Sequence, residues 1–258
     1  MLEAGLWAAL GQSALLVGAL LVARFPKLTE PRWLGLVMAF GAGALISAIT
    51  TDLVAEAYHE AGRAPTGVGL LVGAVGYYGL TTWLDRRAER EDPEEPVEEA
   101  ADVSLAELPA GADATAARNL TVGMVLDGIP ESIAIGLTLL GGGVVSFALV
   151  GAVFLSNLPE AIGVAAALLA GRIPLRNVLL RFGAIVLVGA IAGAIGFGVL
   201  DASEADLIAV IQAIAAGAMV VVVVNEMIPI AVRGAGRHAG LAAAGGFAVA
   251  AFLATVQV

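Results

Sequence analysis

The sequence predicts an all-α integral membrane protein, a bundle of eight transmembrane helices in which the fourth and fifth are central and kinked by proline. Three observations predict it: the composition, the length of the apolar runs and the placement of the basic residues. Of the 258 residues, 59% are hydrophobic and 14% are charged, and the mean hydropathy is +0.93. Soluble globular proteins are nearer half apolar and a quarter charged. The composition therefore excludes an ordinary water-soluble enzyme.

Eight apolar runs follow one another, and each is long enough to cross a bilayer as a helix. A hydrocarbon core about 30 Å thick needs about 20 helical residues. The alternation of apolar and polar residues that marks the strands of a membrane barrel is missing. The expected helices cover residues 4–23, 34–57, 66–84, 117–140, 144–170, 178–200, 206–231 and 239–257.

The 13 basic residues lie almost entirely on one set of connections. All but Arg63 lie on or beside the connections that follow the first, third, fifth and seventh runs. Lys and Arg are concentrated in the cytoplasmic loops of membrane proteins. We therefore expect a multi-pass protein of the plasma membrane, surrounded by the lipid bilayer, with both termini outside the cell.

One connection, about 85–116, is long and differs sharply in composition from the rest. It holds eleven acids between Asp85 and Asp113, together with three prolines and few large apolar side chains. Such a segment cannot build a core. We expect a flexible acidic cytoplasmic loop within a single transmembrane domain that covers 1–258. A solvated tether is the plainer interpretation of this loop, and weak cation buffering at the inner mouth is the functional one.

Six carboxylates lie inside the apolar runs or near their ends, and no Lys or Arg lies deep in a run to pair with them. Each acid at mid-membrane costs about 2.5–3.5 kcal/mol on insertion scales. Carboxylates that face one another repel unless they share a proton or a cation. Since the chain has no cysteine, thiolate ligands and cysteine catalysis are excluded, and a cation held by oxygen atoms is the interpretation we favour. The six are Asp52, Glu56, Asp127, Glu131, Glu160 and Glu226.

The fourth and fifth runs repeat one arrangement, LDGIPESIAIG in the fourth and LSNLPEAIGVA in the fifth. Asp127 and Glu131 are four residues apart and share a helix face, and Ser156 and Glu160 repeat that spacing. Each proline removes a backbone donor and frees the carbonyl one turn earlier. Free carbonyls are tolerated at membrane depth only beside a polar cavity or an ion. We therefore expect an oxygen-rich cation site between these two helices.

Several candidates also have a plainer interpretation. Ser156 and Asn157 are able to form hydrogen bonds across helices without binding a cation. Glu226, in VVVVNEMIPI, is a candidate metal ligand, but it lies nearer a run end, where water is able to solvate it. His59 is either an exposed side chain or, beside Glu60, a metal ligand at the outer mouth. The candidates for the path into or out of the site are Asp52, Glu56 and His59.

With these motifs, the chain resembles the zinc/iron-regulated-transporter-like (ZIP) metal transporters over essentially its whole length. The fourth and fifth helices of that family typically read HNxPEG and H[ND]xPEG, where this chain has DGIPES and SNLPEA. DLVAEA from Asp52 is similar to HLLPEA in the family's second helix, and GAMVVVVVNEMIPI from Gly217 is similar to GAMxxxxxEEIPE in its seventh. Eight helices, external termini and a long loop between the third and fourth helices are also features of the family.

The chain departs from the family at its histidines. Asp127 and Ser156 stand where the family has histidine, and Gly128 stands where it has asparagine, which leaves a second metal position open. Oxygen ligands favour Mn²⁺ or Fe²⁺ over Zn²⁺, which imidazole favours, whereas the family is mainly known for zinc. The metal-site residues that the resemblance implies are Asp127, Glu131, Asn157 and Glu160, with Ser156 beside them.

The sequence thus predicts a transporter of divalent metal cations of the Zn²⁺, Mn²⁺ and Fe²⁺ class. It would move the metal toward the cytoplasm by alternating access, with the metal as substrate rather than as cofactor. No Walker motif is present, so direct use of ATP by this chain is not expected. We also expect neither an enzymatic activity nor a nucleic-acid partner. The alternatives are a proton- or sodium-coupled carrier for another solute, an intramembrane aspartyl protease, which lacks its GxGD setting at Asp127, and a non-transporting membrane protein. A homodimer stays open.

Overall fold

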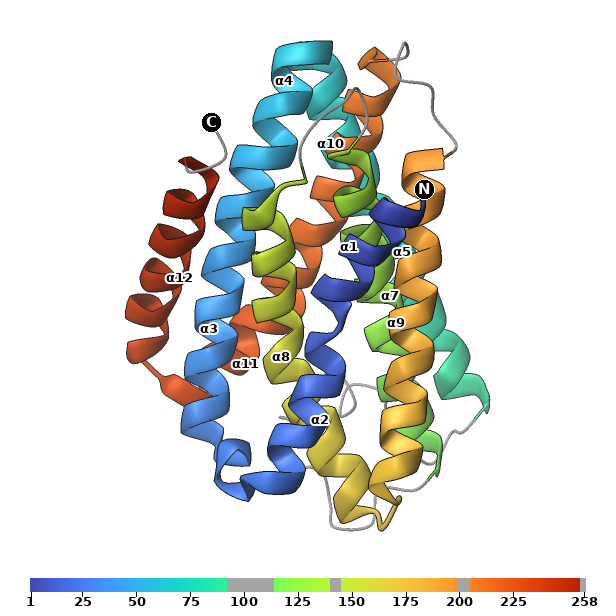
Figure 1. Cartoon of the computed structure of the whole chain (residues 1–258), viewed down its shortest axis with the longest axis vertical. Coiled ribbons are helices and arrows are strands. Elements are labelled where there is room, and N and C mark those ends of the chain that lie inside the picture. Colours follow the sequence, from blue (N-terminus) through green and yellow to red (C-terminus); the bar gives the residue numbers. More distant parts are fainter. Residues whose placement is uncertain (92–113, 140–144, 199–204, 256–258) are drawn as a thin grey trace.

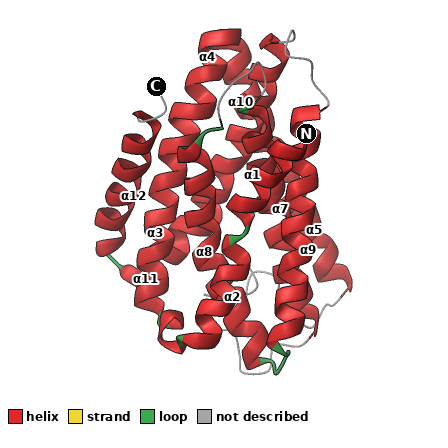
Figure 2. Ribbon diagram, viewed as in Figure 1, coloured by secondary structure: helices red, strands yellow, loops and turns green. Residues whose placement is uncertain are grey.

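The computed structural model describes residues 1–91, 114–139, 145–198 and 205–255, and within these ranges it is all-helical (Figures 1 and 2). The described residues form eight helical rods and no strand. The rods are α1 and α2 (Leu2–Gln12 and Ala14–Arg24), α3, η2 and α4 (Pro31–Ala48, Ile49–Val54 and Ala55–Ala61), α5 (Arg63–Glu91), α7 (Ala114–Leu137), α8 (Phe147–Ala170), α9 (Leu175–Gly198), α10, η4 and α11 (Ala205–Val222, Val223–Met227 and Ile228–Ala235) and α12 (His238–Thr255). A short helix, η1 (Pro26–Thr29), follows α2.

Among the residues that the structure describes, six of these rods hold a stretch long and apolar enough to cross a bilayer: α1–α2, α3–α4, α8, α9, α10–α11 and α12. In α7 the apolar stretch is the shorter Gly128–Leu137. Large apolar side chains face outward from the bundle, including Leu71, Leu187 and Leu241, each more than 60% exposed. An apolar exterior around a helical bundle is suited to lipid, in which helices satisfy their own backbone groups. By length and composition this is a multi-pass membrane protein.

The helices on either side of the acidic connection are longer than the apolar runs predict. The third run was expected to end at residue 84, whereas α5 continues to Glu91, and α7 begins at Ala114 rather than at 117. The added turns of α5 read DRRAERE, which is rich in good helix formers but is not apolar. The predicted loop 85–116 is therefore shorter at both ends, and its remaining residues 92–113 lie outside the described residues.

Two rods contain a wider π-helical turn, and each such turn carries a candidate carboxylate. In η2, which holds Asp52, the hydroxyls of Thr50 and Thr51 donate to the carbonyls four residues earlier, at 2.7 and 3.0 Å. In η4, which holds Glu226, the cause is Pro229, because proline cannot donate the next hydrogen bond of the helix. Single π-helical turns are frequent at functional sites.

The rods pack as two groups that meet along two seams. In the first group, the Glu131 half, α9 packs on α1 and α7, and α2 packs on α8 and α9. In the second group, the Glu226 half, α3 packs on α11 and α12, and α10 packs on α4 and α5. The two halves join where α3 and α12 contact α8 and where α7 contacts α10 (Figure 1). The two helices that carry the Pro-Glu motifs, α7 and α8, therefore lie in one half and both face the other half.

A glycine lets the two halves approach at the Pro-Glu turn of α8. A Cβ on Gly41 of α3 would lie 2.6 Å from the carbonyl oxygen of Leu155 and 2.9 Å from the Cα of Ser156. Pro159 lacks the amide hydrogen that the Leu155 carbonyl would otherwise accept. The backbone of α3 thus abuts α8 at the carbonyl that proline sets free, where no side chain would fit.

The rods alternate in direction. Met1 and the end of α12 lie toward the same end of the bundle as α4. The short helix η1 and the turn from α8 to α9 lie toward the opposite end (Figure 1). Glycine makes the sharp turn after α4, where Gly62 has φ +82°, and the turn after α11, where Gly236 has φ +55°. An even number of rods returns the chain to the end where it began.

Candidate functional site

The centre of the candidate site is the carboxylate of Glu131 on α7. This side chain is only 4% exposed. Asn157 on α8 donates from Nδ2 to Oε2 of Glu131 at 2.7 Å, and Oγ of Ser156 lies 3.3 Å from Oε1. The adjacency of the two Pro-Glu helices that the sequence predicts is therefore confirmed, and they meet at this carboxylate.

The two α8 side chains are held in place by their own helix. Nδ2 of Asn157 donates its second hydrogen to the carbonyl of Val153 at 2.8 Å, and Oγ of Ser156 also reaches that carbonyl, at 3.0 Å. The amide of Asn157 thus uses both of its hydrogens, so its nitrogen must face Glu131. The hydroxyl of Ser156 has one proton, which serves either Val153 or Glu131. Asn157 is therefore the fixed donor of this pair, and Ser156 is the adaptable one.

A third helix also reaches the carboxylate. Gln12, the last residue of α1, is completely buried and donates from Nε2 to Oε2 of Glu131 at 3.4 Å and to the carbonyl of Gly128 at 3.2 Å. The rod is interrupted directly after it, at Ser13, whose hydroxyl bonds to the carbonyl of Leu10 at 2.6 Å. Glu131 is thus contacted from α1 as well as from α8.

Two buried polar atoms beside this cluster have no hydrogen-bond partner among the described residues: Oε1 of Gln12 and Oγ of Ser132. Oγ of Ser132 and Cγ of Gln12 lie on the side where α9 packs, whereas Oε1 of Gln12 lies beside Gly128 of α7. A Cβ on Gly189 of α9 would lie 2.8 Å from Oγ of Ser132 and 2.9 Å from Cγ of Gln12. Because buried polar atoms are almost always satisfied in proteins, each of these two oxygens is able to accept a further contact.

The donors described around Glu131 are neutral amide and hydroxyl groups. They offset part of the cost of burying the carboxylate. The groups that surround it, from α1, α7 and α8, offer oxygen atoms as ligands, and the chain contains no thiolate at all. Such a set of ligands suits a hard or borderline cation.

Two further candidates lie one turn away from this cluster. Asp127 is on α7, one turn before Glu131, and its side chain lies outside the described part of the structure. Glu160 is half-buried on α8, one turn after Ser156. Their participation stays a prediction from the spacing of the two motifs.

Glu226 belongs to the other half of the bundle. It is half-buried on η4, and the hydroxyl of Tyr77 on α5 donates to its Oε1 at 3.5 Å. The contact that the structure describes for this candidate ligand thus comes from α5, whereas the contacts of Glu131 come from α1 and α8.

Asp52 connects the two halves. Its carboxylate accepts a hydrogen bond from Ser146, which directly precedes α8. It also lies 2.9 Å from the hydroxyl of Thr51, whose one proton serves either Asp52 or the Ser47 carbonyl. The hydroxyl oxygen of Ser146 also accepts the backbone N–H of Leu149 at 3.0 Å, which caps the first turn of α8. A candidate of the access path is therefore tied to the start of the helix that carries Asn157.

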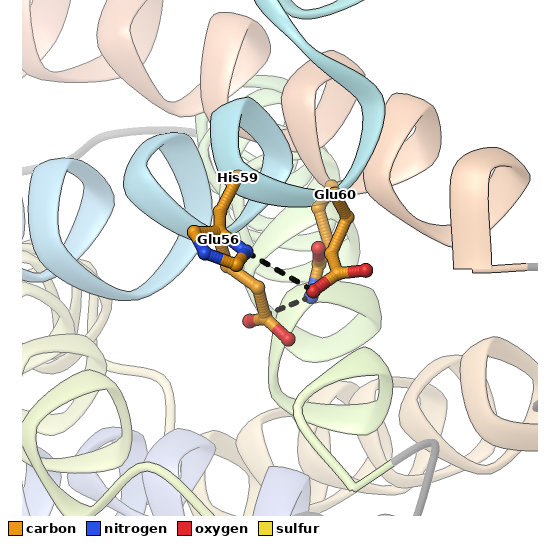
Figure 3. A network of polar contacts seen from close by, with 4 residues as sticks. Glu56, His59 and Glu60 are labelled. Carbon is orange, nitrogen blue, oxygen red and sulfur yellow. Dashed lines mark hydrogen bonds and ion pairs between the residues drawn. The ribbon is translucent and has the colours of Figure 1, made fainter.

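The other two candidates of the access path lie on α4 (Figure 3), which is near one end of the bundle (Figure 1). Gln212 of α10, itself buried, donates to Oε2 of Glu56 at 3.2 Å. Nδ1 of His59 lies 3.4 Å from Oε1 of Glu60, and the His59 side chain is 86% exposed. Glu56 is thus held by a neighbouring helix, while His59 faces outward with Glu60 as its contact.

The described side chains, which leave out that of Asp127, include no group of three His, Cys, Asp or Glu residues placed to hold a metal ion. No protein-family model and no curated protein matches this chain. The resemblance to the ZIP transporters therefore rests on the DGIPES and SNLPEA motifs and their related partners in the second and seventh helices.

Sequence reasoning missed the glutamines that contact the candidate carboxylates. Gln12 and Gln212 are each at most 1% exposed, and they contact Glu131 and Glu56 respectively. A signal was available, because each is a polar amide flanked by apolar residues within a largely apolar run. Buried polar side chains in membrane helices face the bundle interior. The sequence alone does not predict which carboxylate each amide contacts.

Proposed function

We propose that this chain is a transporter of divalent metal cations, which moves its substrate toward the cytoplasm by alternating access. One observation carries the proposal: the buried carboxylate of Glu131, contacted by Asn157 from α8 and by Gln12 from α1. An ionisable residue inside a membrane bundle is costly and marks a pathway for ions or protons in most proteins that keep one. A divalent cation is the ligand that we propose for this carboxylate.

The motif spacing supports a divalent rather than a monovalent substrate. Asp127 lies one turn before Glu131 on the same face of α7, and Glu160 follows the equivalent proline of α8. Together with Glu131 they bring up to three negative charges to one region. Such a field favours a dication, and resemblance to the ZIP transporters supports the same assignment of residues.

The ligand chemistry supports a preference within the divalent cations. In place of the histidines of the ZIP motifs the chain has Asp127 and Ser156. Oxygen-only sites favour Mn²⁺ or Fe²⁺ relative to sites with imidazole. We therefore propose Mn²⁺ or Fe²⁺ as preferred substrates, with Zn²⁺ as an accepted one. The metal passes through as substrate and is not held as a cofactor.

The proposed arrangement in the membrane has eight crossings, including α5 and α7, with both termini outside the cell. The strong concentration of basic residues on the connections opposite α4 supports this orientation. In this orientation Asp52, Glu56 and His59 lie on the external side of Glu131. They then form the acidic path along which a cation reaches the central site, in the plasma membrane of the cell.

The test is uptake of metal by sealed vesicles that contain the purified full-length chain. Uptake is measured for Mn²⁺, Fe²⁺, Zn²⁺, Cd²⁺ and Mg²⁺, with protein-free vesicles as control. The proposal predicts saturable uptake of at least one transition metal without ATP. Uptake of another solute that responds to a proton or sodium gradient, with no response to divalent metals, would instead identify a coupled carrier and contradict the proposal.

A further inference from the structure

We propose that Gln12 belongs to the cation site as a ligand from a third helix, and that its side-chain amide supplies the polar group that Gly128 lacks. This inference rests on the proposed function and assigns it a residue that the motifs of α7 and α8 do not contain. It follows from three observations: the space at Gly128, the unpartnered oxygen of Gln12 and the distances around its nitrogen.

The amide of Gln12 fills the space that a side chain at residue 128 would take. A Cβ on Gly128 would lie 2.9 Å from Nε2 and 3.1 Å from Oε1 of Gln12. Contacts this short are not compatible with both groups in place, so the bare glycine is what admits the amide. Gln12 thus reaches the polar face of α7 between Asp127 and Glu131, where α7 itself offers no side chain.

The carbonyl oxygen of this amide is buried and has no donor within the part of the chain that the structure describes. Gln12 is 0% exposed, and its Oε1 has no hydrogen-bond partner among the described residues. Leaving such an acceptor unsatisfied costs about 1–3 kcal/mol. Amide carbonyls are ordinary ligands of hard cations. A cation bound here would satisfy Oε1, which an apolar contact cannot do.

The distances around the nitrogen fit a shared cation. Nε2 lies 3.4 Å from Oε2 of Glu131 and 3.2 Å from the carbonyl oxygen of Gly128. Oxygen atoms that share one cation at about 2.0–2.6 Å lie about 2.8–3.7 Å apart in octahedral geometry. A half-turn of the amide about its last bond exchanges the positions of nitrogen and oxygen. It then places Oε1 at ligand spacing from both of the other oxygens.

The Gln12 amide therefore has two orientations, one that donates hydrogen bonds and one that binds a cation. With nitrogen toward Glu131 it donates to the carboxylate and to the Gly128 carbonyl. With oxygen toward Glu131 it joins these two oxygens as a third ligand of a cation. The break in the rod at Ser13, directly after Gln12, places this side chain at a local irregularity rather than inside a regular helix.

Three variants of the full-length chain separate this role from simple packing. Gln12→Met keeps the length and volume of the side chain and removes its polar atoms. Gly128→Ala leaves Gln12 unchanged and pushes its flexible amide away, because the new methyl group takes its place. The double variant contains both changes. Ser47→Ala is the matched control, since Ser47 is equally buried, also has an unpartnered oxygen among the described residues, and lies on α3 in the other half.

Binding of Mn²⁺ and of Zn²⁺ is measured by titration calorimetry on detergent-purified protein, and thermal unfolding confirms that each variant is folded. We expect the affinity of Gln12→Met and of Gly128→Ala for the better-bound metal to fall about tenfold or more. The double variant should bind no more weakly than Gln12→Met, because Gly128→Ala acts through the amide. Ser47→Ala should bind as the wild type does.

Unchanged affinity in both single variants, with a wild type that binds metal, would overturn the role of Gln12 and leave the proposed function standing. If Gln12→Met does not fold, unchanged affinity in Gly128→Ala alone overturns it. A wild type that binds neither Mn²⁺ nor Zn²⁺ would instead overturn the proposed function itself, and the role of Gln12 with it.

Discussion

Nδ2 of Asn157 lies 2.7 Å from Oε2 of Glu131, and its other hydrogen is bound by the Val153 carbonyl of its own helix at 2.8 Å. The orientation of the Asn157 amide is therefore set by α8 and does not depend on Glu131. In consequence the Asn157 amide fixes the position of the Glu131 carboxylate relative to α8. This link is the shortest hydrogen bond described between the two Pro-Glu helices.

Replacing Asn157 by aspartate converts this donor into a second carboxylate at the same place. Without metal, Asn157→Asp is expected to lower the stability by about 1–3 kcal/mol, because a buried hydrogen bond is lost and two carboxylates face each other. A shared divalent cation removes the repulsion, so added Mn²⁺ should raise the unfolding temperature more in the variant than in the wild type. Thermal unfolding with chelator and with Mn²⁺ measures both effects.

The control for this variant is Asn177→Asp, the same substitution at an exposed position on α9. It should change neither the stability nor its response to Mn²⁺. An Asn157→Asp protein that is as stable as the wild type in chelator would show that residue 157 does not face Glu131.

The close approach of α3 to α8 predicts opposite effects at two glycines. Gly41→Ala places a methyl group 2.6 Å from the backbone oxygen of Leu155, which cannot move aside, so we expect a loss of about 1–3 kcal/mol. Gly151→Ala, on α8 itself, meets nothing within 4 Å and should stabilise the helix by about 0.5–1 kcal/mol. The measurement is the unfolding temperature of each variant and of the wild type in the same detergent. Equal temperatures would mean that α3 and α8 are not in backbone contact.

Ion preference is predicted to depend on Asp127. Asp127→His replaces an anionic oxygen by imidazole, which favours Zn²⁺. The ratio of Zn²⁺ to Mn²⁺ uptake should therefore rise in this variant. Asp206→His, at the exposed start of α10, should leave the ratio as it is in the wild type. An unchanged ratio in Asp127→His would mean that Asp127 is not a ligand of the transported ion.

The orientation in the membrane is testable with single cysteines, because the chain contains none of its own. Glu60→Cys on α4 should react with an impermeant maleimide in intact cells, whereas Arg176→Cys at the start of α9 should react only after the cells are made permeable. Both side chains are exposed, so burial does not confound the comparison. The opposite pattern would place the basic connections outside the cell and contradict the orientation.

The positions of the helices were predictable because an apolar run has a length that the bilayer sets. The run 178–200 became α9 at Leu175–Gly198, and the run 239–257 became α12 at His238–Thr255. The residues in the last turns of α5 favour a helix but are not apolar, so the predicted apolar run ends before the helix does. The pairing of helices, such as α10 with α5 or α2 with α8, depends on contacts between distant segments, which apolar periodicity does not encode.

The contact between Ser156, Asn157 and Glu131 lies between residues that the repeated Pro-Glu spacing had already selected. Gln12 was out of reach of that reasoning, because its role depends on the missing side chain of Gly128, 116 residues away. The π-helical turns at Asp52 and Glu226 were also missed. They coincide with threonine hydroxyls that bond back to the helix and with a proline, and a count of apolar residues registers neither feature.

The most direct test of the account is the initial rate of Mn²⁺ entering sealed vesicles that contain the Glu131→Gln variant. This substitution keeps the shape of the side chain and removes the charge that we assign to the cation. Glu3→Gln, at the exposed first turn of α1, is the matched control. We predict that Glu131→Gln lowers the rate by about 100-fold or more, while Glu3→Gln transports at the wild-type rate. Wild-type transport by Glu131→Gln would contradict the assignment of the cation site to Glu131.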